Sequence, residues 1–208
     1  MIYTIIITVV FVVSLYLVTL QKELTMSTSN YILELEKTKA VLLYIVNKLN
    51  NADLLKIFKI LYFAEQKHLT TYGNLIISDK YVAMKNGPVP SLVYDLFKEI
   101  RGDRERIEKN NTFYDAFSVK ENSNVIANEN ANLDYLSTSD IECLNESILE
   151  NKNLTSKKLS DKSHDYAWDS APLNNEINSI DIAIAGGANK EMLKYVSECL
   201  SNRELISA

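Results

Sequence analysis

The amino-acid sequence predicts a mainly helical α+β fold: a single helical domain of about six helices with a small antiparallel sheet, preceded by an N-terminal hydrophobic segment. Apolar residues recur at helical spacing in several windows. Capping residues and glycines bound those windows, and β-branched stretches are few and short. At 208 residues, 47% of them hydrophobic, the chain is long enough to bury a sizeable core.

The first segment is the uncharged run from Ile2 to Leu20, which is just long enough to cross a bilayer as a helix. A membrane anchor here, with lysines after it, would leave the body in the cytoplasm. The alternative is a start at Met26, which opens a polar leader. Both alternatives stay open, so we divide the chain into a hydrophobic segment, residues 1–25, and a domain, residues 26–208, that we expect to be soluble and active alone.

Two helices follow. The spacing of apolar residues predicts a first helix over Glu34–Leu49, which Asn50 and Asn51 end. Asp53 is placed to cap a second helix over Leu54–Tyr72, and Gly73 is placed to end it. One face of this second helix carries Leu54, Phe58, Leu61, His68 and Tyr72.

The middle of the chain predicts the small sheet and one helix. Residues 75–84 indicate an extended segment or hairpin arm. Gly87–Pro90 predicts a stiff turn, with Pro90 at the first position of a helix over Ser91–Ile100. The mixed charges of residues 101–111 predict a solvated, internally paired connection. Phe113–Val119 and Asn124–Ala127 then predict the two strands of a hairpin.

The C-terminal half predicts three more helices. Ser137 and Asp140 have the spacing of a capping box, before an apolar stripe of Ile141, Leu144 and Ile148. A short helix is expected near residues 155–161, and Gly186-Gly187 breaks the chain again. Asn189 is placed to cap the last helix, whose inward residues are Met192, Leu193, Val196 and Leu200.

Composition limits the possible functions. A net charge of −5 argues against a general nucleic-acid binder, which needs a basic face. Most of the acidity lies in residues 111–208, with 16 Asp/Glu against 8 Lys/Arg. Two cysteines, Cys143 and Cys199, and two histidines are too few for a disulfide framework or an ordinary zinc site. We therefore expect no metal and no cofactor, and we expect both cysteines to be small core residues.

The two histidines are the candidate acid–base groups. His68 is either such a group or a core-edge histidine hydrogen-bonded to backbone, and the second interpretation is favoured because no nucleophile is paired with it. His164 lies four residues before Trp168, a spacing that lets the two rings stack on one helical face. Ser160, Ser163 and Asp165 lie nearby, but nothing marks a nucleophile elbow. We expect no catalytic residues.

Three segments in a fixed order carry a resemblance to a known family. They are Leu61-Tyr62-Phe63-Ala64 followed by His68-Leu69 and Tyr72-Gly73; Ala83-Met84-Lys85-Asn86-Gly87-Pro88-Val89-Pro90 followed by Tyr94; and Ser163-His164 followed by Trp168. Together they resemble the Panacea domain family of bacterial and phage proteins, which includes the SocA-like antitoxins. The resemblance covers about Lys37 to Ala171. The sequence departs from the family at Met84, where tryptophan is usual.

The resemblance implies an antitoxin, a cytoplasmic protein that neutralises a cognate protein toxin, encoded beside it, by direct binding. From the net charge we expect no nucleic-acid partner. Three alternatives remain: an adaptor that delivers a toxin to a protease, a His-dependent enzyme, and an interaction protein anchored in the inner membrane. An acidic face would suit a basic toxin. The residues that match the family motif, and are therefore candidates for partner binding, are Tyr62, Phe63, His68, Tyr72, Lys85, Gly87, Pro88, Val89, Pro90, Tyr94, His164 and Trp168.

The same motif predicts a packing arrangement. We expect His164 and Trp168 to pack against the Gly87–Pro90 segment and against the helix that bears Tyr62 and Phe63. Because the Gly87–Pro90 segment is stiff, it would support part of the contact surface at little entropic cost. Tyr81 and Tyr94 are the expected aromatic anchors.

Overall fold

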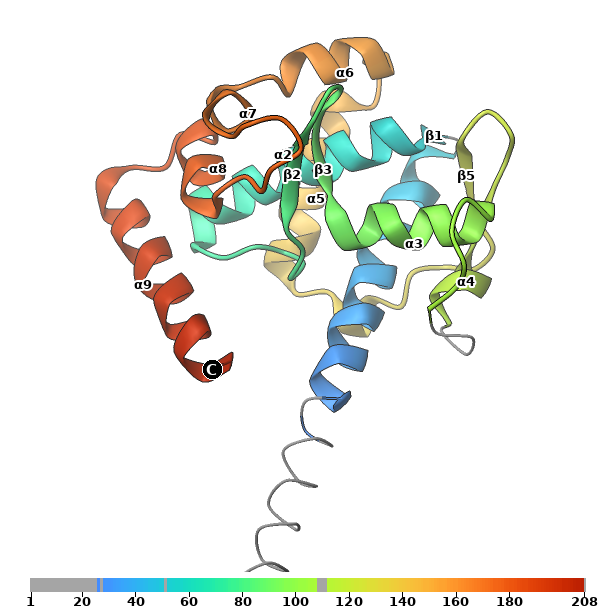
Figure 1. Ribbon diagram of the computed structural model, residues 1–208, viewed down its shortest axis with the longest axis horizontal. Coiled ribbons are helices and arrows are strands. Elements are labelled where there is room, and N and C mark those ends of the chain that lie inside the picture. The colour runs from blue at the N-terminus through green and yellow to red at the C-terminus, as the bar shows by residue number, and fades with distance from the viewer. Residues whose placement is uncertain (1–25, 27, 51, 108–111, 208) are drawn as a thin grey trace, which may run out of the picture. The chain divides into compact units, whose positions relative to one another are not determined.

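The computed structural model describes residues 26, 28–50, 52–107 and 112–207 (Figure 1). The chain divides into two compact units, residues 1–36 and residues 37–208; the second is called the body below. The described residues of the first unit are helical. The hydrophobic run Ile2–Leu20 lies outside the described residues. None of the helices that are described is long and apolar enough to span a membrane.

Helix α2 (Leu54–Tyr72) is the central element of the body, with helices and one hairpin packed along most of its surface (Figure 1). The Asp53 carboxylate caps it by accepting a hydrogen bond from the Lys56 amide at 2.9 Å. Gly73 ends it with a φ of +77°. The predicted bounds and both caps are confirmed. Residues 28–49 are also helical and end where predicted, at Asn50, which has a φ of +58°.

Strands β2 (Tyr81–Met84) and β3 (Gly87–Pro90) form an antiparallel hairpin whose turn is Lys85-Asn86. The prediction of a turn at Gly87–Pro90 is therefore wrong. Proline is tolerated in this strand because Tyr81 and Ala83, the residues opposite Pro90 and Pro88, direct their backbone hydrogen bonds to the other side. Their partners there lie within residues 174–177. The two prolines thus occupy the positions at which the hairpin needs no N–H donor.

Helix α3 (Ser91–Arg101) begins directly after β3. Pro90 is its N-cap, one position before the predicted place, and has no side chain that can cap. The Asp79 carboxylate takes this role from the preceding segment, accepting hydrogen bonds from the amides of Leu92 and Val93, both at 3.0 Å. One carboxylate therefore fixes the start of α3 relative to the hairpin.

A three-stranded sheet lies beyond α3, in the order β1 (Ala52–Asp53), β5 (Asn124–Ala127), β4 (Phe117–Val119). The predicted hairpin is confirmed for β4 and β5. Phe113–Ala116, however, forms helix α4 rather than the start of a strand. This single turn places Phe113 and Phe117 on one side, where both rings contact the Phe97 ring, with centroids 5.7 and 5.4 Å away. Aromatic packing thus overrides the weak alternation of the sequence.

The C-terminal half is helical: α5 (Thr138–Asn151), α6 (Ser156–Lys162), α7 (Tyr166–Ser170), α8 (Ser179–Ala185) and α9 (Lys190–Ser207), after a 3₁₀ turn, η1 (Leu133–Tyr135). The predicted capping box of Ser137 and Asp140 and the cap at Asn189 are confirmed. Helices α4, α7 and α8, of four to seven residues, are additional to the six expected, because so few turns carry no readable periodicity. Both cysteines are free thiols.

Side chains of α2 contribute to a hydrophobic core that joins it to the hairpin and to α6, α7, α8 and α9. Val196 of α9 is buried there, and Met192, Leu193 and Leu200 pack against it, as the sequence predicts. The buried members of this core are Tyr62, Phe63, Leu69, Tyr81, Ala83, Leu159, Ala167, Ile177, Ile182, Ala183 and Val196.

Candidate interaction site

A buried lysine of α2 anchors the hairpin. The Lys59 side chain is fully buried, and its ammonium donates a hydrogen bond to the Pro88 carbonyl at 2.6 Å. Pro88 lies opposite Ala83 at a position without hydrogen bonds between the two strands, so its carbonyl points away from β2. Because β3 is an edge strand, this carbonyl would otherwise lack a partner. Burial lowers the pKa of Lys59 from 10.5 to about 7, and the negative charge of Asp165 acts in the opposite direction.

Asp165 links α2 to α7. Its carboxylate accepts hydrogen bonds from the Tyr62 hydroxyl at 3.1 Å and from the Gln66 amide Nε2 at 2.7 Å. The same carboxylate caps α7 by accepting from the amides of Ala167 and Trp168. Burial, followed by the charge of Asp165, raises the pKa of the Tyr62 hydroxyl well above its usual value. Tyr62 is therefore a neutral hydrogen-bond donor inside the fold.

Helices α6 and α7 hold the tip of the hairpin. Ser160 donates to the Asn86 carbonyl at 3.0 Å, and the Trp168 indole donates to the Met84 carbonyl at 2.8 Å. Gly87 lies so close to Ser163 that a Cβ at position 87 would be 2.2 Å from the serine Oγ. The segment that carries Ser163-His164 and Trp168 therefore contacts the hairpin and α2. The prediction named His164 and Trp168, but most of these contacts are made by Ser160, Ser163 and Asp165.

His164 stacks on Trp168, with ring centroids 4.0 Å apart. The predicted contact between the two rings is confirmed. The prediction that both residues lie on one helical face is wrong, because His164 precedes the N-cap of α7. The His164 Nε2 atom is buried and has no hydrogen-bond partner among the described residues. No serine or cysteine hydroxyl or thiol is hydrogen-bonded to His164 in that part of the chain, so the geometry does not resemble a catalytic dyad.

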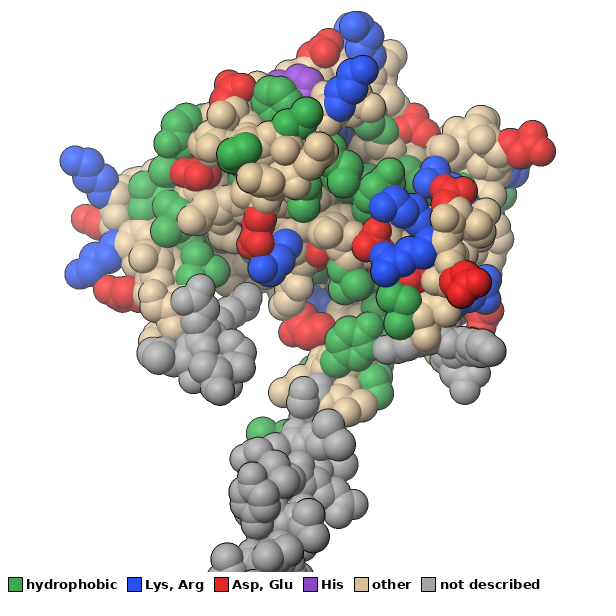
Figure 2. All heavy atoms as spheres, in the orientation of Figure 1, with side chains coloured by type: hydrophobic (Ala, Val, Ile, Leu, Met, Phe, Trp, Pro, Cys, Tyr) green, Lys and Arg blue, Asp and Glu red, His purple; other side chains and the backbone are tan. Residues whose placement is uncertain are grey.

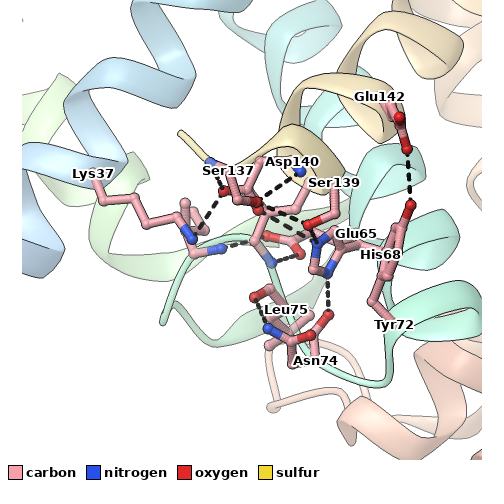
Figure 3. Close-up of polar contacts among 12 residues, drawn as sticks. Lys37, Glu65, His68, Tyr72, Asn74, Leu75, Ser137, Ser139, Asp140 and Glu142 are labelled. Carbon is pink, nitrogen blue, oxygen red and sulfur yellow. Dashed lines mark hydrogen bonds and ion pairs between the residues drawn. The ribbon is translucent and has the colours of Figure 1, made fainter. Parts of the chain in front are cut away.

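A second polar cluster surrounds His68 near the other end of α2 (Figure 3). The His68 Nδ1 atom lies 2.6 Å from the Asn74 carbonyl, which can only accept, so Nδ1 carries the proton. The Nε2 atom lies 3.2 Å from the Ser139 hydroxyl and 3.4 Å from the Asp140 carboxylate. The backbone-bonded interpretation of His68 is therefore confirmed.

Two further ionisable residues complete this cluster. Lys37 forms an ion pair with Asp140 at 3.1 Å. The buried Glu65 carboxylate accepts hydrogen bonds from the amides of Ile76 and Ile77, at 2.6 and 3.1 Å, and so fixes the loop after α2 (Figure 3). Burial raises the pKa of Glu65 from 4.5 to about 8, although both amides favour the charged form. Among the described residues, no group of three or more His, Cys, Asp or Glu side chains is arranged to hold a metal ion.

An open groove of about 620 Å³ lies between the hairpin tip, the start of α2 and α3. Figure 2 shows hydrophobic side chains reaching the surface here, beside basic side chains over α3. The Tyr94 and Phe58 rings form a T-shaped pair with centroids 6.1 Å apart, and the Lys98 ammonium lies 4.1 Å from the Tyr94 centroid. The apolar lining consists of Leu54, Leu55, Phe58, Met84, Val89 and Tyr94.

The structure does not bring the twelve motif residues into one surface. Lys85, Tyr72, Tyr94, His164 and Trp168 are at least partly exposed. Tyr72, at the far end of α2, donates to Glu142 at 2.8 Å (Figure 3). The expectation that Tyr81 is an anchor for a partner is wrong, because its side chain is only 1% exposed. The motif residues that are buried are Tyr62, Phe63, His68, Gly87, Pro88, Val89 and Pro90.

Sequence reasoning missed the structural roles of Lys59 and Glu65. Both belong to a stretch of α2 that is apolar on every side, from Ile57 to Ala64 and beyond. A helix that is hydrophobic all round is buried, so charged residues within it must find partners inside the protein. The sequence alone therefore indicates that these charged residues are buried and paired. It does not indicate the partners of Lys59, because Pro88 and Asp165 come from distant parts of the chain.

The buried Lys59 predicts a pH-dependent stability. Between pH 8 and 10 the unfolded chain keeps the lysine proton, whereas the folded chain, with a pKa of about 7, has lost it. Stability from this group therefore rises with pH, at up to about 1.4 kcal/mol per pH unit. We expect Lys59→Met to remove this rise. Urea denaturation of both proteins at several pH values measures it, and a constant difference between them would contradict the assignment.

A family model described as Antitoxin SocA-like, Panacea domain, matches residues 57–169. Neither the curated proteins nor the solved structures compared with the chain gave a match. The matched residues run from α2 through the hairpin and α5 to α7, and so include Lys59, Tyr62, Gly87, Asp165 and Trp168, whose contacts hold these elements together. This match covers more than half of the 208 residues, and the chain therefore belongs to the SocA-like antitoxin family with a Panacea domain.

Proposed function

We propose that this protein is the antitoxin of a toxin–antitoxin system and neutralises a cognate protein toxin in the cytoplasm by direct, stoichiometric binding. Membership of an antitoxin family is the observation that carries the proposal. The contacts of the motif residues support it, since Tyr62, Gly87 and Pro88 fix a scaffold rather than surround a substrate. The scaffold leaves an open groove at the hairpin tip as a surface for a partner.

The enzyme alternative finds little support in the surroundings of the histidines. His68 lies within hydrogen-bonding distance of the Ser139 hydroxyl, but the histidine side chain is only 3% exposed. The Asn74 carbonyl and the Ser139 hydroxyl also lie within hydrogen-bonding distance of its two ring nitrogens. A general base must reach both a nucleophile and a substrate, and this imidazole is enclosed. We therefore assign His68 to the stability of the α2–α5 contact.

A rescue titration tests the proposal. The full chain and the product of the adjacent reading frame are expressed from separate inducible promoters, and growth and the amounts of both proteins are measured. We expect growth to recover only when the antitoxin equals or exceeds the toxin, with the amount of toxin unchanged. Recovery at strongly sub-stoichiometric antitoxin would contradict binding. A fall in toxin amount that requires a cellular protease would instead favour the adaptor alternative.

A further inference from the structure

The groove at the hairpin tip differs in charge from the rest of the chain. The whole sequence carries a net charge of −5. The charged residues that line the groove are Asp53, Lys85 and Arg101. Both oxygens of the Asp53 carboxylate are already engaged, one by the Lys56 amide and the other by the Ser156 hydroxyl. The carboxylate keeps its negative charge, so the three charged lining residues together carry a net charge of +1.

The two basic residues differ in their availability. Arg101 forms an ion pair with Asp103 at 2.6 Å, and its side chain remains 26% exposed. Lys85 is exposed in the turn of the hairpin and makes no hydrogen bond or ion pair within the described part of the chain. Its turn is held by the Ser160 and Trp168 hydrogen bonds to Asn86 and Met84. The ammonium is thus presented from a fixed backbone, which reduces the ordering needed on binding.

The apolar part of the groove is equally preformed. Leu54, Phe58 and Val89 are nearly buried and form its floor, while Leu55, Met84 and Tyr94 are half-buried. An apolar side chain entering this space would displace water from six hydrophobic side chains. Aromatic and aliphatic anchors in such pockets usually dominate binding energy. Together with the basic edge, this lining defines the chemistry of an occupant.

We propose that the groove binds a segment of the toxin that inserts an apolar side chain between Leu55, Met84 and Tyr94 and places a carboxylate beside Lys85. This inference rests on the proposed function and adds the location and chemistry of the contact. The occupant is an acidic, apolar-anchored segment, because the lining carries two basic residues against one acidic residue and its exposed cation, Lys85, is unpaired among the described residues. It therefore differs from the docking of a basic toxin on an acidic face, which the overall charge would favour.

Two pairs of variants of the full chain test the proposal, with the purified product of the adjacent reading frame as probe. Leu55→Glu places a negative charge in the groove, at the second position of α2, where the helix dipole favours it. Leu55→Lys makes the same loss of apolar surface with the opposite charge. Lys85→Glu reverses the free cation, and Lys190→Glu makes the same change at an exposed position of α9, outside the groove.

We expect the dissociation constant to rise at least about tenfold for Leu55→Glu and Lys85→Glu, clearly less for Leu55→Lys, and not at all for Lys190→Glu. Thermal unfolding of each variant verifies that it is folded. If the wild-type chain binds and both Glu variants bind equally well, the groove is not the contact and the proposed function stands. Equal loss with Leu55→Glu and Leu55→Lys would overturn the acidic occupant. If the wild-type chain neither binds nor rescues, the proposed function itself fails.

Discussion

Replacing Gly87 with alanine is expected to lower the free energy of unfolding by about 3–5 kcal/mol. Gly87 has a φ of +92°, which strains any residue with a Cβ. The added Cβ would also lie 2.2 Å from the Ser163 Oγ and 3.0 Å from the Lys59 Nζ. Ser163 is fully buried and donates to the Ser160 carbonyl, so it cannot move without losing that bond. Chemical denaturation measures the loss.

Gly187→Ala is the matched control. Its φ of +90° is nearly the same, but nothing lies within 4 Å of the position its Cβ would take. We expect it to cost only the backbone strain, about 1 kcal/mol. Adding Ser163→Ala to Gly87→Ala removes the clashing oxygen and should restore part of the stability. Equal losses for the two glycine variants would show that the hairpin is not packed on Ser163 and Lys59.

Replacing Asp165 with alanine is expected to cost about 3–4 kcal/mol of stability. The change leaves the buried Tyr62 hydroxyl and the Gln66 amide without their acceptor. It also removes the N-cap of α7 and the negative charge that opposes the lowering of the Lys59 pKa. Urea denaturation of Asp165→Ala measures the total loss of stability. Comparison with the pH profile of Lys59→Met separates the part due to the lost hydrogen bonds from the part due to the lost charge.

Asp169→Ala provides the control for this change. Asp169 lies on the same short helix α7 but is exposed, so its removal should alter stability by less than about 0.5 kcal/mol. If Asp165→Ala is as mild as Asp169→Ala, the carboxylate does not hold α2 and α7 together. The assignment of the Ser163–Trp168 segment to the scaffold would then be wrong.

The elements that could be predicted from the sequence are those defined by local signals. Helix α2 was bounded correctly because Asp53 and Gly73 are an N-cap and a left-handed C-terminal residue in immediate contact with it. The capping box of Ser137 and Asp140 is local in the same way. Local signals predict a turn at Gly87–Pro90, where the structure has a strand. Its prolines fit a strand only because Tyr81 and Ala83 direct their backbone hydrogen bonds to residues 174–177, which lie far away in the chain.

In the candidate site, too, only the local part can be predicted from the sequence. The family motif identifies its residues, but it does not indicate which of them face a partner. Gly87 faces inward because Ser163 lies against it. Tyr62 faces inward because it bonds to Asp165, about a hundred positions away in the chain. Lys85 faces outward because it occupies the hairpin turn. Partner-facing residues of this kind are defined by tertiary register, which a single sequence does not contain.

The most direct measurement of the central claim, neutralisation by binding, is a calorimetric titration of the purified full chain into the product of the adjacent reading frame, with toxin activity assayed in the same samples. The proposed function predicts a single transition at one equivalent of antitoxin, and loss of toxin activity that reaches completion at that same point. Complete loss of activity at a small fraction of an equivalent, or full inhibition without heat of binding, would contradict it. Either result would show that the protein acts on the toxin by turnover rather than by occupying it.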